Sequence, residues 1–303
     1  AKSVTGYVSD EAPAVMNSHL LRAMALFEAI RVYGTNYEID PSTPMSELHL
    51  QKNAVDFLQF PKQTLEYRAG DCDDLTILYA ALLESLGIDT AAITIPGHIF
   101  AAFSTGLPED SVGDHGWSDY IIDDGIVWIP VEVTAIDKGF SGAWRMGARE
   151  WRDATEVGSA SFYPVHEAWE IYEPVQMPGD VTISVPSEEE IANAFRSELA
   201  ILINYELEPQ VHELEQRIED SQGSPTHRNR LGVLYGKYHR FEEAETVFRS
   251  LIGERPFIPA LLNLGHVMRM TDRGESAMEF YDRAFVLSPD NPSVLLSLAI
   301  AQF

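Results

Sequence analysis

The sequence predicts an α+β domain over residues 1–173, a linker over residues 174–186 and an all-helical domain over residues 187–303. Two observations predict this order. In the first part, apolar residues change from helical spacing to strand-like runs near residue 90, and helices followed by strands are typical of an α+β fold. In the last third, small and aromatic residues recur at a fixed interval, which is typical of stacked helical hairpins.

Three helices are expected before the strands. Residues 12–33 carry a broad apolar face, and residues 46–58 form a second helix that Pro61 ends. Residues 72–86 give the clearest helical pattern, because four apolar side chains form one stripe that stops at Gly87. The stripe consists of Leu75, Tyr79, Leu82 and Leu86.

Four strands are predicted to follow. Residues 90–95 and 98–103 are β-like runs joined by a Pro-Gly turn. Residues 120–122 and 126–133 are expected to form a hairpin, because the Asp-Asp-Gly sequence between them is a strong turn signal. Pro130 indicates a sheet edge or a bulge, since proline lacks the N–H that a central strand needs.

The segments after the hairpin give weaker patterns. Residues 139–153 are predicted to be helical, and residues 169–172 to form one more strand. Residues 174–186 are rich in proline, as linkers often are. The Ser187-Glu-Glu-Glu190 sequence is a capping box, which predicts the start of a helix.

Five positions of the last third match positions 33 residues later. Leu231, Gly232, Ala244, Phe248 and Pro256 correspond to Leu264, Gly265, Ala277, Tyr281 and Pro289. Small residues at fixed points let paired helices pack closely, and the proline ends the second helix of each pair. Residues 292–303 match the first helix of a third pair, and residues 208–222 match the second helix of an earlier one.

This pattern resembles the tetratricopeptide repeat, whose period is about 34 residues; plain helical hairpins are the alternative. The resemblance implies a concave groove, lined by the first helix of each pair, that binds a protein or peptide partner. Asn229, Tyr235 and Asn263 are the candidate groove residues. The alternative for these three is that they are ordinary solvated polar residues.

The composition limits the partners. A net charge of −26 argues against nucleic acid or an anionic membrane surface, and no apolar run is long enough to span a membrane. Most of the excess acid lies before residue 187, which favours a basic or cation-bearing partner there; solubility explains it equally well. A single cysteine excludes an internal disulfide and a cysteine-rich zinc site.

Cys72, the only cysteine, lies at the predicted start of a helix, where the positive end of the helix dipole favours a thiolate. His98 opens one predicted strand and Glu132 closes another. These are the attacking group, base and orienting group that a thiol nucleophile needs. The alternatives are inert packing for Cys72 and a structural role for His98. Rivals for the place of Glu132 are Asp119, Asp123 and Asp124.

The Gly70-Asp-Cys-Asp-Asp74, Gly97-His98 and Trp128-Ile-Pro-Val-Glu132 segments resemble the transglutaminase-like cysteine-enzyme superfamily, which has a papain-like core. The resemblance covers about residues 45–140. It implies that Cys72 is the nucleophile, His98 the base and Glu132 the orienting group, where the family usually has Asp. The implied reaction is thiol-dependent acyl transfer on an amide or peptide, as a peptidase, amidase or transglutaminase, with no required cofactor. The alternative is an inactive domain that acts as a protein- or peptide-binding scaffold.

Other residues near Cys72 suggest further roles. The oxyanion donors are expected to include the Cys72 N–H, with Gln63 as a candidate side-chain donor. Asp71 and Asp73 flank the thiol: either Asp71 is a plain helix cap, or these acids bind Ca²⁺ with a third carboxylate from residues 119–124. Some periplasmic proteins of the group that the chain resembles bind calcium, and an extracytoplasmic location is favoured over the cytoplasm, although the compartment stays open.

Overall fold

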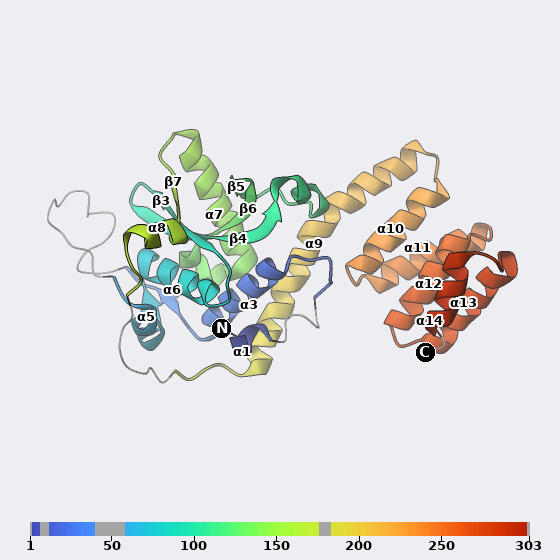
Figure 1. Cartoon of the computed structure of the whole chain (residues 1–303), viewed down its shortest axis with the longest axis horizontal. Helices are drawn as coiled ribbons and strands as arrows, with labels where there is room; N and C mark the ends of the chain where they lie inside the picture. The colour runs from blue at the N-terminus through green and yellow to red at the C-terminus, as the bar shows by residue number, and fades with distance from the viewer. Residues whose placement is uncertain (1, 7–11, 40–57, 176–182, 302–303) are drawn as a thin grey trace. The chain divides into compact units, whose positions relative to one another are not determined.

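The computed structural model describes residues 2–6, 12–39, 58–175 and 183–301 (Figure 1). The helix expected at residues 46–58 therefore falls almost wholly outside the described residues. The chain divides into two compact units, one formed mainly by residues 16–202 and the other mainly by residues 203–303. The first combines helices with a β-sheet, and the second is entirely helical where it is described.

The sheet of the first unit has five antiparallel strands in the order β5-β6-β4-β3-β7. The strands are β3 (Thr90–Ile95), β4 (His98–Pro108), β5 (Ile121–Asp123), β6 (Ile126–Val131) and β7 (Ser161–Pro164). The first four correspond to the predicted strands. Asp124 and Gly125 both have positive φ in the turn between β5 and β6, as a two-residue hairpin turn requires.

Pro130 lies in β6, which is an inner strand. It is paired with Ala102 of β4 on one side, whereas β5 pairs only with residues 126–128 on the other. The missing N–H of Pro130 is thus tolerated because β5 ends before this residue. Pro130 therefore has the predicted edge position only locally, within an inner strand.

The strand predicted at residues 169–172 is wrong. Most of this segment belongs to a helix, α8 (Val165–Ile171), and the fifth strand of the sheet, β7, precedes it. Apolar residues at alternate positions suggested a strand, but Trp169 stacks on His166 with ring centroids 4.6 Å apart. A contact between residues three apart is the spacing of a helix.

The helices around the sheet meet in an aromatic core. The main ones are α3 (Ser18–Val32), α5 (Pro61–Tyr67), α6 (Cys72–Glu84) and α7 (Gly139–Glu156). Phe27 of α3 makes edge contacts with Tyr79 of α6 and Phe140 of α7, both at 5.8 Å between centroids. This packing fixes α6 and α7 relative to each other.

One helix start differs from the predictions, and Pro61 has a role that was not predicted. Pro61 begins α5, because the first turn of a helix does not need the N–H that proline lacks; the helix that Pro61 was predicted to end lies almost wholly outside the described residues. The helix predicted from residue 12 begins at Ser18, where the side chain of Asn17 accepts a hydrogen bond from the Leu20 N–H. Shorter elements complete the unit: α1 (Lys2–Thr5), β1 (Asn36–Tyr37), β2 (Ala69–Gly70), η1 (Glu109–Asp114) and η2 (Val133–Lys138).

Six helices follow from residue 188. They are α9 (Glu188–Asp220), α10 (Pro225–Lys237), α11 (Phe241–Glu254), α12 (Ile258–Met270), α13 (Gly274–Leu287) and α14 (Pro292–Ala301). The Ser187 capping box is present, since the Ser187 N–H binds Glu190 Oε2 and the Glu190 N–H binds Ser187 Oγ. The segment 208–222 is not a separate helix, because α9 continues across Pro209 and ends only at Asp220.

The close helix packing predicted from the 33-residue repeat is present. A Cβ added to Gly232 would lie 2.5 Å from the Phe248 ring, and one added to Gly265 would lie 2.3 Å from the Tyr281 ring. Only glycine lets these helix pairs approach so closely. Among the described helices, none combines the length and apolar character that a membrane crossing needs.

Candidate active site

Cys72 is the first residue of α6. Asp71 caps the helix by accepting a hydrogen bond from the Asp74 N–H, and the Asp74 carboxylate accepts one from the Asp71 N–H. Gly70 is needed beside this cap, because a Cβ there would lie 2.6 Å from the Cβ of Asp74. The Cys72 residue is only 3% exposed, so the thiol is held at the buried start of the helix.

His98, the first residue of β4, contacts both Cys72 and Glu132. Its Nε2 lies 2.6 Å from Glu132 Oε2, and its side chain also hydrogen-bonds to Cys72. Thr76, one turn after Cys72, donates to the Ile99 carbonyl at 3.4 Å, which ties α6 to the start of β4.

The electrostatics of the pair favour a charged imidazole. Burial lowers the pKa of His98, but the hydrogen bonds and charges of Cys72 and Glu132 outweigh burial and raise this pKa to about 10. His98 is therefore an imidazolium at neutral pH. Burial acts to raise the pKa of Glu132, but its bonds to His98 and Thr134 lower it overall.

Glu132 follows the last residue of β6 and is 1% exposed. Its Oε1 accepts hydrogen bonds from the Thr134 N–H, at 2.9 Å, and from the Thr134 hydroxyl. Its own N–H donates to the Ala143 carbonyl of α7 at 3.0 Å. Each oxygen of this carboxylate thus has a fixed partner, which orients the one that faces His98.

Gly147 explains how α7 comes so close to Glu132. A Cβ at this position would lie 3.0 Å from three backbone atoms, the N of Glu132, the N of Val131 and the carbonyl carbon of Pro130. Backbone cannot yield as a flexible side chain can, so glycine is required for this approach.

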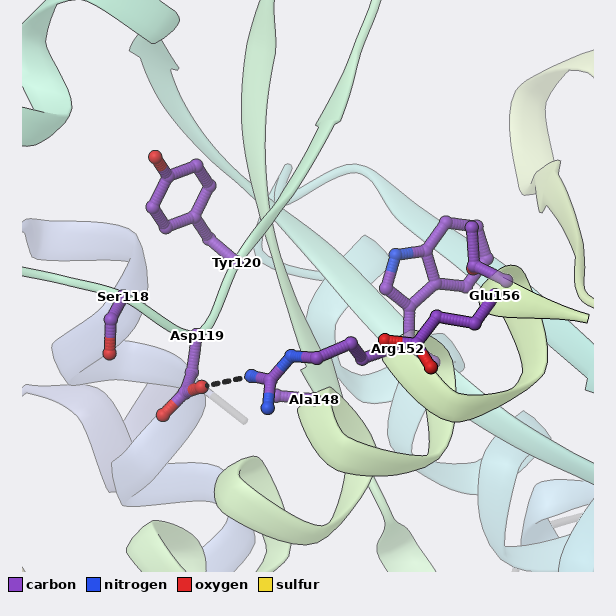
Figure 2. Close-up of a pocket in the computed structure, with 8 residues that line it drawn as sticks. Ser118, Asp119, Tyr120, Ala148, Arg152 and Glu156 are labelled. Carbon is purple, nitrogen blue, oxygen red and sulfur yellow. Dashed lines mark hydrogen bonds and ion pairs between the residues drawn. The ribbon is translucent and has the colours of Figure 1, made fainter.

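The rival aspartates lie elsewhere. Asp119 forms an ion pair with Arg152 at 2.7 Å, which Figure 2 shows at the edge of a pocket of about 280 Å³. That pocket is lined by residues of α7 and of the segment before β5, and none of Cys72, His98 and Glu132 lines it. Asp123 and Asp124 lie at the β5–β6 turn. Among the described residues, Glu132 is the carboxylate closest to His98 Nε2.

Two residues that the sequence analysis did not predict lie at this site. Glu150 of α7 has its Oε2 3.8 Å from His98 Nε2. Tyr37 of β1 has its pKa raised by burial and by the nearby Cys72, Asp71 and Glu132, so its hydroxyl belongs to the same cluster. A glycine in the middle of a predicted helix, one turn before Glu150, was a sequence signal for close packing. Tyr37 carried no such signal.

The expected auxiliary residues have other contacts. Gln63 accepts a hydrogen bond from the Phe60 N–H with its side-chain oxygen and so caps α5; an oxyanion would be bound by the amide N–H groups of the same side chain, so its predicted role as a donor stays a prediction. Asp71, Asp73 and Asp74 have carboxylate oxygens within 4.8 Å of one another. This acidic group includes no residue of the 119–124 loop in the described structure.

The candidate groove residues of the second unit make the following contacts. Asn263 donates to Asn229 at 3.1 Å across α12 and α10, so these two share a face. Tyr235 has its pKa raised by burial and by Glu215 and Glu243, which places its hydroxyl near those acids. A pocket of about 430 Å³ between α9, α10 and α11 is lined by none of the three candidate residues.

Comparison with known proteins adds no assignment. No protein-family model matches the chain, and no curated protein matches it. A functional assignment therefore depends on the geometry of the site.

Proposed function

We propose that the first unit is a thiol-dependent acyl-transfer enzyme that acts on an amide or peptide bond, as the likeness to transglutaminase-like enzymes suggests. Cys72 is the nucleophile, His98 the general acid and base, and Glu132 the group that orients His98. The observation that carries the proposal is His98 bonded to both Cys72 and Glu132 at the N-terminus of a helix.

The reaction follows from this arrangement. The Cys72 thiolate attacks the amide carbonyl carbon and forms a carbon–sulfur bond, while the carbonyl oxygen takes the negative charge. First-turn amides of α6, which have no partner within the helix, are suited to bind that oxygen. His98 gives its proton to the leaving amine as the carbon–nitrogen bond breaks, leaving a thioester.

The second half of the reaction resolves the thioester. Neutral His98 takes a proton from water, or from an amine acceptor, as that nucleophile attacks the carbonyl carbon. Breaking the carbon–sulfur bond regenerates the Cys72 thiolate beside the imidazolium. Water gives hydrolysis, as in a peptidase or amidase, and an amine gives transamidation; we favour hydrolysis.

Alkylation of Cys72 by iodoacetamide tests the proposal. Because the chain has one cysteine, the mass of the intact protein reports this reaction directly. The wild type should react readily at pH 6.5, whereas His98→Gln should react at least tenfold more slowly, because it lacks the imidazolium. Glu132→Gln should lie between them. Equal rates in all three proteins would refute the nucleophile assignment.

A second candidate function is a binding scaffold with an inactive first unit. The burial of Cys72 favours it, since a substrate carbonyl must reach the sulfur. In both cases we propose that the second unit recruits a protein or peptide partner, as the resemblance to tetratricopeptide repeats suggests. Asn229→Ala with Asn263→Ala should then weaken partner capture without changing the alkylation of Cys72.

A further inference from the structure

His98 faces two carboxylates rather than one. Glu132 Oε2 and Glu150 Oε2 lie 2.6 Å and 3.8 Å from the same nitrogen of His98. Glu150 comes from α7, one turn after Gly147, and thus reaches the site on the helix whose close approach also holds Glu132. The side chain of Glu150 is 27% exposed, compared with 1% for Glu132.

Two carboxylates this close need a proton between them. Carboxylate oxygens of Glu132 and Glu150 lie within 4.8 Å of each other, so a proton on one of them relieves the repulsion between the two charges and lets that carboxyl group donate to the other. Glu150 Oε2 is buried and no donor in the described structure reaches it. Glu132, by contrast, already accepts from His98 and twice from Thr134. The proton therefore belongs on Glu150.

We infer that Glu150 is a positioning residue that shares a proton with Glu132 and thereby sets how readily His98 gives up its own proton. With the proton present, Glu150 donates to Glu132 and draws charge away from the carboxylate that holds the imidazolium. Without it, a second negative charge faces His98 Nε2 and stabilises the imidazolium. The inference rests on the proposed function only for its catalytic consequence.

The surrounding groups support a change near neutral pH. Burial raises the pKa of Glu150 to about 7, the Glu132 charge acts in the same direction, and His98 and Arg149 oppose them. Cys72 also interacts with the imidazole, and the titratable groups around the nearby Tyr37 are Cys72, Asp71 and Glu132. The buried acids Glu28 and Glu198 bind the first turn of α7, at the N–H groups of Phe140 and Ser141.

The consequence for catalysis has a definite sign. Acylation requires His98 to donate its proton to the leaving amine, so acylation slows as Glu150 ionises above pH 7. Resolution of the thioester requires His98 to accept a proton, and this step gains from the ionised Glu150. The pH thus shifts the balance between the two halves of the reaction.

The experiment is a titration of the His98 ring followed by ¹⁵N NMR, with His98→Gln to assign the signals. The wild type should show a step near pH 7, from Glu150, below the titration of His98 itself. Glu150→Gln should lose that step and lower the pKa of His98 by about one unit. Glu150→Asp, which keeps a carboxyl group, should retain a step, and the exposed Asp153→Asn on the same helix should change neither.

The outcomes separate the two proposals. No step near pH 7 in the wild type, or the same step in Glu150→Gln, would overturn the role of Glu150. If the ¹⁵N titration step depends on Glu150 but Cys72 does not react with iodoacetamide, the role of Glu150 stands and the proposed enzyme activity is refuted. A thermal melt of each variant shows whether it is folded, and Glu150→Asp still decides the question if Glu150→Gln is not.

Discussion

Replacing Gly147 with alanine tests whether the approach of α7 to β6 positions Glu132, the carboxylate proposed to orient His98. The added Cβ would lie 3.0 Å from the backbone of Pro130, Val131 and Glu132, whereas ordinary contacts begin at 3.4 Å. All three neighbours are backbone atoms, so α7 or the end of β6 must move by several tenths of an ångström. Glu132 and Glu150 would move with them.

The magnitude follows from two opposing effects. Alanine is more favourable than glycine inside a helix by about 1 kcal/mol, and overpacking costs about 1–3 kcal/mol. The unfolding free energy should therefore fall by about 0–2 kcal/mol. Catalytic groups must be held to within about 0.5 Å, and a shift of a few tenths of an ångström takes up most of that tolerance, so Cys72 alkylation at pH 6.5 should slow by roughly tenfold.

Gly236→Ala is the matched control. Gly236 lies inside α10, and a Cβ there would meet no atom within 4 Å. This variant should gain up to about 1 kcal/mol in urea unfolding and leave the alkylation rate unchanged. If Gly147→Ala gained stability equally and reacted at the wild-type rate, the close approach would have no part in positioning Glu132.

Three further predictions concern pH, packing and calcium. The pKa of His98 is raised to about 10, so its charged form adds to the free energy of unfolding fully below pH 6.5, and this contribution is lost as the pH rises toward 10. In urea unfolding, the wild type should therefore lose roughly 2–3 kcal/mol more free energy of unfolding than His98→Gln between pH 7 and pH 9. Gly232→Ala should lose about 0–2 kcal/mol in the same assay, because its Cβ would lie 2.5 Å from the Phe248 ring, whereas Gly236→Ala one turn later should gain stability. Millimolar Ca²⁺ should raise the melting temperature of the wild type relative to EDTA but not that of Asp73→Asn, and equal shifts in both proteins would exclude these acids as the ligands.

The arrangement of Cys72, His98 and Glu132 could be predicted because each residue marks the end of a local element. A helix start, a strand start and a strand end are set by nearby sequence, and the structure places all three at one point. The order of Cys72, His98 and Glu132 along the chain then suggested which residue is the nucleophile, which the base and which the orienting group.

Glu150 and Tyr37 could not be predicted in the same way. Their positions depend on how α7 and β1 pack against distant segments, and β1 is only two residues long. The same limit explains the error at residues 169–172. A short apolar pattern suits either a strand or one face of a helix.

The calcium prediction and the role inferred for Glu150 have the same physical cause, which is the excess of negative charge around Cys72. One imidazolium faces the Cys72 sulfur, Glu132 and Glu150, and the cap Asp71 lies near the same cluster, so one further positive charge would be stabilising. A proton on Glu150 supplies it on the Nε2 side of His98, whereas a cation at Asp73 would supply it on the side of Cys72. The group formed by His98, Glu132 and Glu150 shares no residue with the group formed by Asp71, Asp73 and Asp74. Asp73→Asn should therefore leave the ¹⁵N step near pH 7 unchanged, and Glu150→Gln should leave the rise in melting temperature with Ca²⁺ unchanged. Loss of both effects in either variant would mean that the proton and the cation compensate one another through the Cys72–His98 pair.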